Sequence, residues 1–157
     1  DGVGGMFVPV DALHDDSAHD KIHVSLLKTI SKRSRATSGV FLLDFCFSGS
    51  FLCRTQTRSS WQERIRMEKA RVVVTSGLSD ERVDDDNGSG HSPFTSALLG
   101  SIKDMKGRNN GQGSIIELFV DVRSRIVNVG TTSAVPKLGR FPGCGGGDAF
   151  LNQLDKP

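Results

Sequence analysis

The chain has 157 residues, of which 36% are hydrophobic and 24% charged, and its net charge is +2. This composition is typical of one soluble globular domain, and so small a charge gives no reason to expect nucleic acid or a membrane as a partner. No apolar run is long enough to span a bilayer. The three cysteines are spaced neither as a disulfide framework nor as a zinc site, so we expect no metal and a reducing compartment, the cytoplasm.

The first forty residues predict a strand, a helix and the approach to a second strand. Residues 4–12, GGMFVPVDA, predict a short strand closed by a proline. Residues 17–33 predict a helix, because apolar residues recur there at helical spacing. With the strand that follows, they make a strand–helix–strand unit of suitable length for a parallel crossover. The chain starts at Asp1, and its first residues resemble the middle of a domain, so we expect part of the domain to precede it.

A buried strand ending in a carboxylate and a thiol comes next. Residues 40–43, VFLL, are apolar without alternation, which is typical of a strand covered on both faces. Asp44, Phe45 and Cys46 follow, and then the small residues 48–50. Because α/β sheets place their chemistry at the carboxyl ends of parallel strands, Cys46 is a candidate nucleophile. The alternative is a passive buried cysteine, the usual role of an isolated thiol.

Two carboxylates are candidates for a binding pocket beside that thiol. Asp44 and Cys46 are alternate residues, so they share a face of a regular strand. A carboxylate disfavours a neighbouring thiolate, and Asp44 is therefore better suited to receiving a cation than to activating Cys46. Glu81 follows the next predicted strand and adds a second negative charge. For Asp44, a solvated carboxylate at the strand end is an equally good interpretation.

The second half of the chain completes an α/β pattern. Residues 54–71 hold six Arg or Lys and two Glu, which predicts an exposed loop with a short helix. Residues 71–77 predict another buried strand, and Ser92-Pro93 predicts the start of a helix. Ser114 and Glu117 form a capping-box pattern for a helix to about residue 127, although residues 115–120 alone would also fit a strand. A glycine-rich loop and a short strand close the chain over 139–152.

None of the four histidines is an obvious partner for Cys46. His14, His19 and His23 flank or lie in the first predicted helix, and His91, before the Ser-Pro helix start, is a minor candidate for pairing with the thiol. The acidic run at 84–86 does not have the spacing of a calcium-binding loop. Cys53 and Cys144 lack the strand-end setting of Cys46 and are interpreted as passive.

Several segments together resemble one family of cysteine peptidases. The stretch DFCFSG at 44–49 resembles the nucleophile motif of the caspase-like clan, in particular metacaspases and bacterial caspase-like peptidases. Residues 1–12 are similar to the segment that follows the family's catalytic Gly-His-Gly turn. Residues 70–83 and 90–102 resemble the first strand and helix of its small subunit, and 135–151 its closing loop and strand. Phe45 and Phe47 depart from the small or polar neighbours usual around the family's cysteine.

The resemblance implies a fold and a division of the chain. The expected fold is caspase-like: an α/β, flavodoxin-like, mostly parallel sheet flanked by helices, truncated at its N-terminus. Residues 1–157 would form a partial peptidase domain, with 1–53 as the end of the large-subunit-like part. A basic linker would then occupy 54–70, and the small-subunit-like part 71–157.

The resemblance also implies an activity, a cysteine endopeptidase acting on protein or peptide substrates. Cys46 would attack the scissile carbonyl, with its N–H helping to hold the oxyanion, and the histidine partner would lie before residue 1. We therefore expect the 157-residue chain alone to be inactive. Asp44 and Glu81 would line an acidic S1 pocket for Arg or Lys, whereas caspases proper receive Asp in a basic one. The basic linker at 54–71 would then offer arginines that fit this acidic pocket, so the enzyme would be expected to cleave its own linker. No cofactor is expected, and calcium activation stays open.

Two other hypotheses remain. The chain would be a catalytically inactive caspase-like homologue, serving as an interaction or regulatory module, if no histidine accompanies it. It would be an unrelated flavodoxin-like protein if Cys46 is structural. A crevice-facing thiol favours the enzyme over the second of these.

Overall fold

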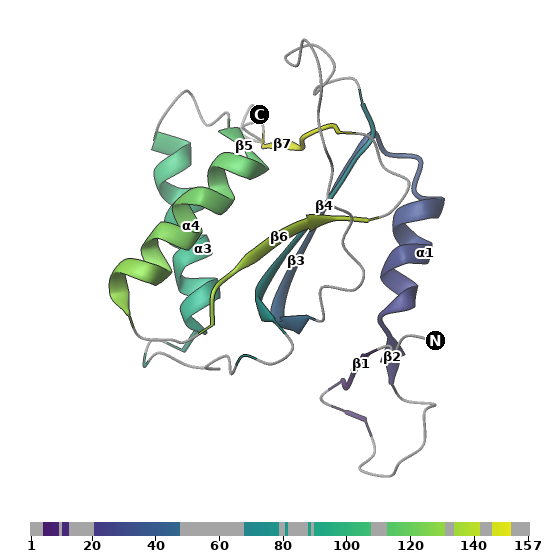
Figure 1. Cartoon of the computed structure of the whole chain (residues 1–157), viewed down its shortest axis with the longest axis horizontal. Helices are drawn as coiled ribbons and strands as arrows, with labels where there is room; N and C mark the ends of the chain where they lie inside the picture. Colours follow the sequence, from purple (N-terminus) through teal and green to yellow (C-terminus); the bar gives the residue numbers. More distant parts are fainter. Residues whose placement is uncertain are drawn as a thin grey trace. The chain divides into compact units, whose positions relative to one another are not determined.

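The computed structural model describes residues 5–9, 11–12, 21–47, 68–78, 81, 88, 90–107, 113–130, 134–141 and 146–151. The chain divides into two compact units, Asp1–Arg35 and Ala36–Pro157, which are treated separately below (Figure 1). The linker expected at 54–70 lies almost wholly outside the described residues, and the proposed division of the chain stays a prediction.

The first unit contains a small hairpin-like sheet and one helix. Strands β1 (Met6–Phe7) and β2 (Ile22–His23) pair antiparallel, and α1 spans Ser25–Arg33. The helix predicted over 17–33 therefore begins later than expected, since Ile22 lies in β2. The reason is that the backbone before Ser25 has sheet partners: the N–H of buried Val24 donates to the carbonyl of Gly5 at 3.0 Å. The parallel crossover expected between this unit and β3 stays a prediction.

The second unit is built around a three-stranded sheet in the order β3-β4-β6. Strand β3 (Ser38–Phe47) runs parallel to β4 (Ala70–Leu78), and β6 (Lys137–Arg140) runs antiparallel to β4. Central strand β4 is buried from residue 70 to residue 77, which explains its apolar run without alternation. The predicted α/β fold is confirmed, and the described sheet is mixed.

Two helices cover one face of this sheet. Helix α3 (Pro93–Gly107) and helix α4 (Ile115–Val129) lie side by side (Figure 1). The even-numbered residues Val72 and Val74 of β4 pack with Phe94 of α3 and Leu118 of α4 in one core. The other core members are Ala70, Ile115, Val122, Ile126 and Ala149. Apolar burial of this kind stabilises the fold by about 25 cal/mol for each Å² removed from water.

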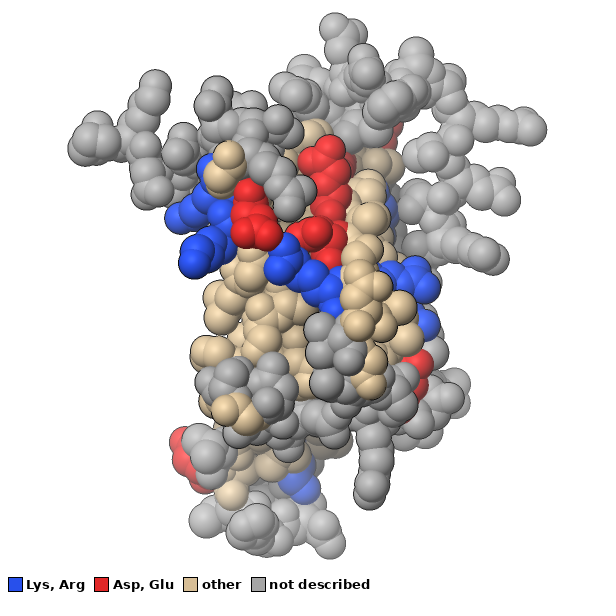
Figure 2. Space-filling model, turned by 90° about the vertical axis from the view of Figure 1, so that its left-hand side faces the viewer, with Lys and Arg blue, Asp and Glu red and all other residues tan. Residues whose placement is uncertain are grey.

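The outer surface of the two helices carries charges of both signs. Arg125 of α4 donates to Asp121 one turn earlier, at 3.0 Å, and to Asp104 of α3. Figure 2, turned toward this side, shows acidic and basic side chains lying next to one another over part of the face, with uncharged surface below them. Because these ions are solvent-exposed, they add little to stability.

A buried arginine joins the beginnings of β3 and β4. Arg71 is 1% exposed, and its Nη1 donates to the carbonyls of Ala70 at 2.7 Å and Thr37 at 3.1 Å. Its Nη2 donates to the carbonyl of Ala36 at 2.5 Å. The guanidinium thus ties the segment that enters β3 to the first residues of β4. Phe41 of β3 and Phe141, just after β6, make an edge-on ring contact, with ring centres 5.0 Å apart.

Helix α4 begins at the capping box that the sequence predicts. The Ser114 hydroxyl accepts from the Glu117 N–H at 3.1 Å, and the Glu117 carboxylate accepts from the Ser114 N–H at 2.9 Å. The helix ends at Gly130, whose φ of 62° is the left-handed conformation that glycine adopts without strain. These caps explain why residues 115–120 form a helix and not the alternative strand.

Residues 149–151 fold back onto the start of α4. Strand β7 (Phe150–Leu151) pairs antiparallel with β5 (Gly113–Ser114), and the Ile115 N–H donates to the Ala149 carbonyl at 2.8 Å. The Gly146 N–H donates to the Glu68 carboxylate at 2.6 Å. Described residues 146–151 are therefore held both to the start of α4 and to Glu68, just before β4.

The cap of α4 gives a stability prediction. Replacing Ser114 by Ala removes the acceptor for the Glu117 N–H, and we expect the free energy of unfolding to fall by about 1 kcal/mol. Urea denaturation measures the change. Ser124→Ala, on the exposed side of the same helix, is the matched control and should cost nothing. Equal losses in the two variants would show that the cap contributes no specific stability.

A buried carboxylate gives a prediction on pH. Burial raises the pKa of Asp148, against the hydrogen bonds from Ser114 and the Ala149 N–H and the nearby charge of Arg140. A raised folded-state pKa means that the folded state holds the proton more tightly, so stability is lost as pH rises from about 4 through that pKa. Asp148→Asn does not titrate and still accepts the Ala149 N–H. We expect it to be more stable than wild type at neutral pH.

The pH dependence of that difference is the test. Urea unfolding between pH 4 and pH 7 should show the advantage of Asp148→Asn shrinking as the pH falls. The exposed Asp11→Asn should show no such trend. An advantage that grows toward low pH would contradict the assignment.

Candidate active site

The candidate nucleophile lies in the sheet, near the carboxyl end of β3. The backbone of Cys46 pairs with Gly77 of β4, and that of Phe47 with Leu78. The strand therefore runs through the cysteine to Phe47, which places Cys46 near the strand end, as the sequence suggested. The side chain of Cys46 lies outside what the structure describes, as do Cys53 and Cys144.

The pairing of β3 with β4 changes register just before Cys46. Leu43 pairs with Thr75 and Cys46 with Gly77, so β3 takes three residue steps where β4 takes two. The extra residue falls at Asp44-Phe45. Such an irregularity bends a strand and redirects side chains, and it is common next to active sites. The prediction that Asp44 and Cys46 share a face assumed a regular strand, so it loses its basis here.

Asp44 is held by the beginning of α3. Its Oδ2 accepts from the Ser92 hydroxyl at 2.5 Å and from the Thr95 hydroxyl at 2.6 Å. The Ser92 oxygen in turn accepts from the Thr95 N–H at 2.9 Å, which makes Ser92 the N-cap that the sequence predicts. One short network therefore connects the end of β3 to the first turn of α3.

Asp44 lies at the first turn of α3, beside the helix N-terminus. The N-terminus of a helix carries a partial positive charge, which stabilises an anion within the first turn. Asp44 is nevertheless exposed, while Ser92 is 7% exposed. The carboxylate is thus fixed from the protein side and open to solvent on the other. Such an arrangement can receive a cation from outside.

Glu81 is held at a different place. Its Oε2 accepts from the N–H of Val135 at 3.3 Å, in the segment that leads into β6. The hydrogen bonds of Asp44 and Glu81 therefore take the two carboxylates to different segments. No described contact brings them together, and the two-carboxylate pocket stays a prediction.

The two histidines that the structure describes lie in different settings. His23 accepts from the Ser25 N–H at 3.1 Å and lies 2.6 Å from the Ser25 hydroxyl, a local contact at the start of α1. His91 is exposed and immediately precedes Ser92, so the chain places it beside the network that holds Asp44. His14, His19, the acidic run 84–86 and linker residues 54–67 lie outside the described residues.

Within the described residues, no group of three or more His, Cys, Asp or Glu side chains is placed to hold a metal ion. None of the described helices is both long and apolar enough to cross a membrane.

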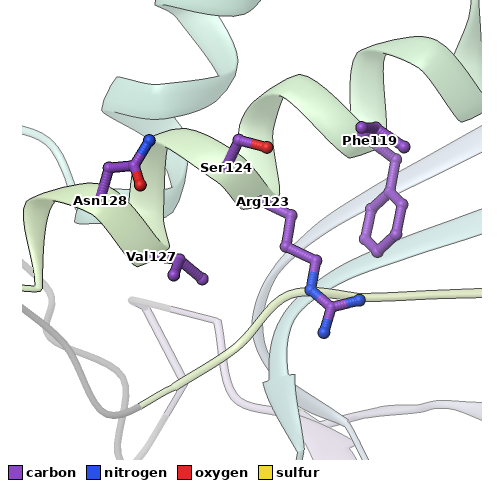
Figure 3. A pocket seen from close by; sticks show the side chains of 6 residues that line it. Phe119, Arg123, Ser124, Val127 and Asn128 are labelled. Carbon is purple, nitrogen blue, oxygen red and sulfur yellow. The ribbon is translucent and has the colours of Figure 1, made fainter.

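A hollow on α4 is separate from the Asp44 network. It encloses about 410 Å³ and is lined by Phe119, Val120, Arg123, Ser124, Val127 and Asn128 (Figure 3). All six residues belong to one helix, so the hollow is an open feature of the surface of α4. It shares no residue with the contacts of Asp44.

The sequence did not predict the partners of Asp44. Ser92 was recognised as a helix cap, but its bond across 48 residues to Asp44 was not, and Thr95 was not singled out. A signal existed in the topology: a helix that follows the neighbouring parallel strand begins near the strand's carboxyl end, where Asp44 also lies.

Comparison with known proteins agrees with the motifs. A family model described as the caspase domain matches residues 2–141, nearly the whole chain. Searches of curated proteins and of solved structures gave no significant match. The family match joins the DFCFSG segment, the buried strand β4 and the Ser-Pro start of α3 in a single domain. The chain belongs to the caspase-domain family of cysteine peptidases.

Proposed function

We propose that this protein is a metacaspase-like cysteine endopeptidase that cleaves after Arg or Lys, with Cys46 as nucleophile. The observation that carries the proposal is Asp44, an exposed carboxylate held by two hydroxyls and placed two residues before the cysteine. A fixed, solvent-open carboxylate at that position suits a cationic P1 side chain. Glu81 would add negative charge to the same S1 pocket.

The chemistry follows from a thiol beside a bound peptide. A histidine, as in other members of the family, takes the Cys46 proton, and the sulfur attacks the scissile carbonyl carbon. The Cys46 N–H would help to hold the resulting oxyanion. The C–N bond then breaks, and the amine leaves with the proton from the histidine. Water hydrolyses the thioester, which releases the new carboxylate and restores the thiol.

Asp44 contributes through the substrate and not through the thiol. Its negative charge disfavours a thiolate nearby, which argues against a role in activating Cys46. A P1 guanidinium or ammonium cancels that charge when it binds. Substrate binding would therefore also remove the electrostatic penalty on the thiolate, so that P1 recognition and nucleophile activation act together.

The nucleophile and the pocket can be tested together. In its full-length context, with the histidine partner, the protein should be labelled at Cys46 by an electrophilic peptide with Arg at P1, and Cys46→Ala should abolish labelling and cleavage while the protein stays folded. Asp44→Asn should lower kcat/KM for a P1-Arg substrate by roughly tenfold to a hundredfold, the value of a hydrogen bond to a charged group.

Two controls make the result specific. Cys53→Ala and Cys144→Ala should keep full labelling, and an electrophile with Asp at P1 should react poorly. Labelling that disappears in either cysteine control would overturn the choice of Cys46. A protein that reacts with neither electrophile would favour the catalytically inactive interaction module.

The proposal extends to the basic linker. Residues 54–71 offer Arg54, Arg58, Arg64 and Arg66, and exposed segments of this composition are preferred sites of cleavage. We expect the full-length domain, when concentrated or activated, to cut itself in this segment, after Arg54 or Arg58. Mass spectrometry should find these cuts in wild type and not in Cys46→Ala. Cuts that persist in the variant would indicate another protease, and cuts after Asp would overturn the acidic pocket.

A further inference from the structure

The hydrogen bonds of Asp44 are concentrated on one of its two oxygens. Both Ser92 Oγ, at 2.5 Å, and Thr95 Oγ1, at 2.6 Å, lie next to Oδ2. An ionised carboxylate only accepts, so both hydroxyls must donate. A carboxylate oxygen has two lone-pair directions, and those of Oδ2 are thus both in use. Within the described residues, Oδ1 takes no hydrogen bond.

The Ser92 hydroxyl both donates and accepts in this arrangement. It gives its single proton to Asp44 and accepts the Thr95 N–H at 2.9 Å. Thr95 therefore touches the network twice, through its backbone and through its side chain. The carboxylate cannot rotate without breaking bonds to a helix terminus, so its orientation is set before any substrate arrives.

This geometry limits how a cation can bind. An arginine side chain pairs most strongly with a carboxylate when two parallel N–H groups reach both oxygens. A lysine ammonium is a compact charge that one oxygen satisfies. With Oδ2 occupied, Oδ1 is the oxygen that remains for the P1 side chain of either kind.

We propose that Ser92 and Thr95 are positioning residues that restrict Asp44 to a one-oxygen contact and so reduce its discrimination between Arg and Lys at P1. This inference rests on the proposed function, because it takes Asp44 as the S1 carboxylate. The hydroxyls touch Asp44 and not the substrate. They set specificity by deciding which acceptor remains.

The two residues differ in what else they do for the fold. Ser92 caps α3, so its removal would also weaken the helix. The Thr95 side chain donates to Asp44 alone among the described hydrogen bonds, and alanine is a good residue at the third helical position. Thr95→Ala is therefore the informative variant, and Thr95→Ser, which keeps the hydroxyl, is its matched control.

The experiment compares paired peptide substrates that differ only in Arg or Lys at P1. We expect the full-length wild-type protein, which supplies the histidine partner, to cleave both with kcat/KM values within a few fold of each other. Thr95→Ala frees one lone pair and leaves room beside Oδ2, so the Arg-to-Lys ratio of kcat/KM should rise about fivefold, the effect of one added hydrogen bond. Thr95→Ser should keep the wild-type ratio.

The outcomes separate the two claims. If Thr95 had only a structural role, Thr95→Ala would lower kcat/KM by the same factor for the Arg and the Lys substrate and leave their ratio unchanged. That result would overturn the positioning role, while the proposed function would stand. A wild-type protein that cleaves after neither Arg nor Lys, or whose Arg cleavage is insensitive to Asp44→Asn, would overturn the proposed function and this inference with it.

Discussion

The pairing of β4 with a strand on each side is the constraint on which the second unit depends. Because β4 is buried from residue 70 to residue 77, its even-numbered valines fix α3 and α4 on one face. Its parallel register with β3 also decides where β3 delivers its last residues. Arg71 holds the entrances of the two strands together, so any slip would leave a buried cation without its carbonyl acceptors.

The same register brings Asp44 within reach of the first turn of α3. The chemical type of its partners there decides whether its negative charge stays available. Its described partners, Ser92 and Thr95, are neutral hydroxyls at a helix N-terminus. Neutral donors orient a carboxylate without cancelling its charge. An arginine or lysine partner would have offset that charge, as Arg125 partly offsets the charges of Asp104 and Asp121. Asp44 is thus kept in place and still attractive to a cation from solvent.

Local patterns were enough to predict most elements, but not the contacts between them. The apolar runs of β3 and β4, the Ser92-Pro93 start of α3 and the capping box of α4 depend on neighbouring residues, and they appear where the sequence placed them. The late start of α1 depends on β1, and the register shift near Asp44 depends on β4. Both come from pairing between distant segments, which hydrophobic period and capping signals do not encode.

The position of Asp44 also bears on whether the protein is an enzyme or an inactive homologue. A carboxylate that served only the fold would be expected to be buried with its partners or paired with a base, since an exposed ion contributes little to stability. Ser92 already caps α3 through its own hydroxyl, so the helix does not need Asp44 for that purpose. An oriented, uncancelled charge on the strand that carries Cys46 has a clear use in binding a cationic substrate. An interaction module would use such a charge on a basic partner, whereas a peptidase would use it on a P1 side chain near Cys46, and the match to a caspase domain favours the second use.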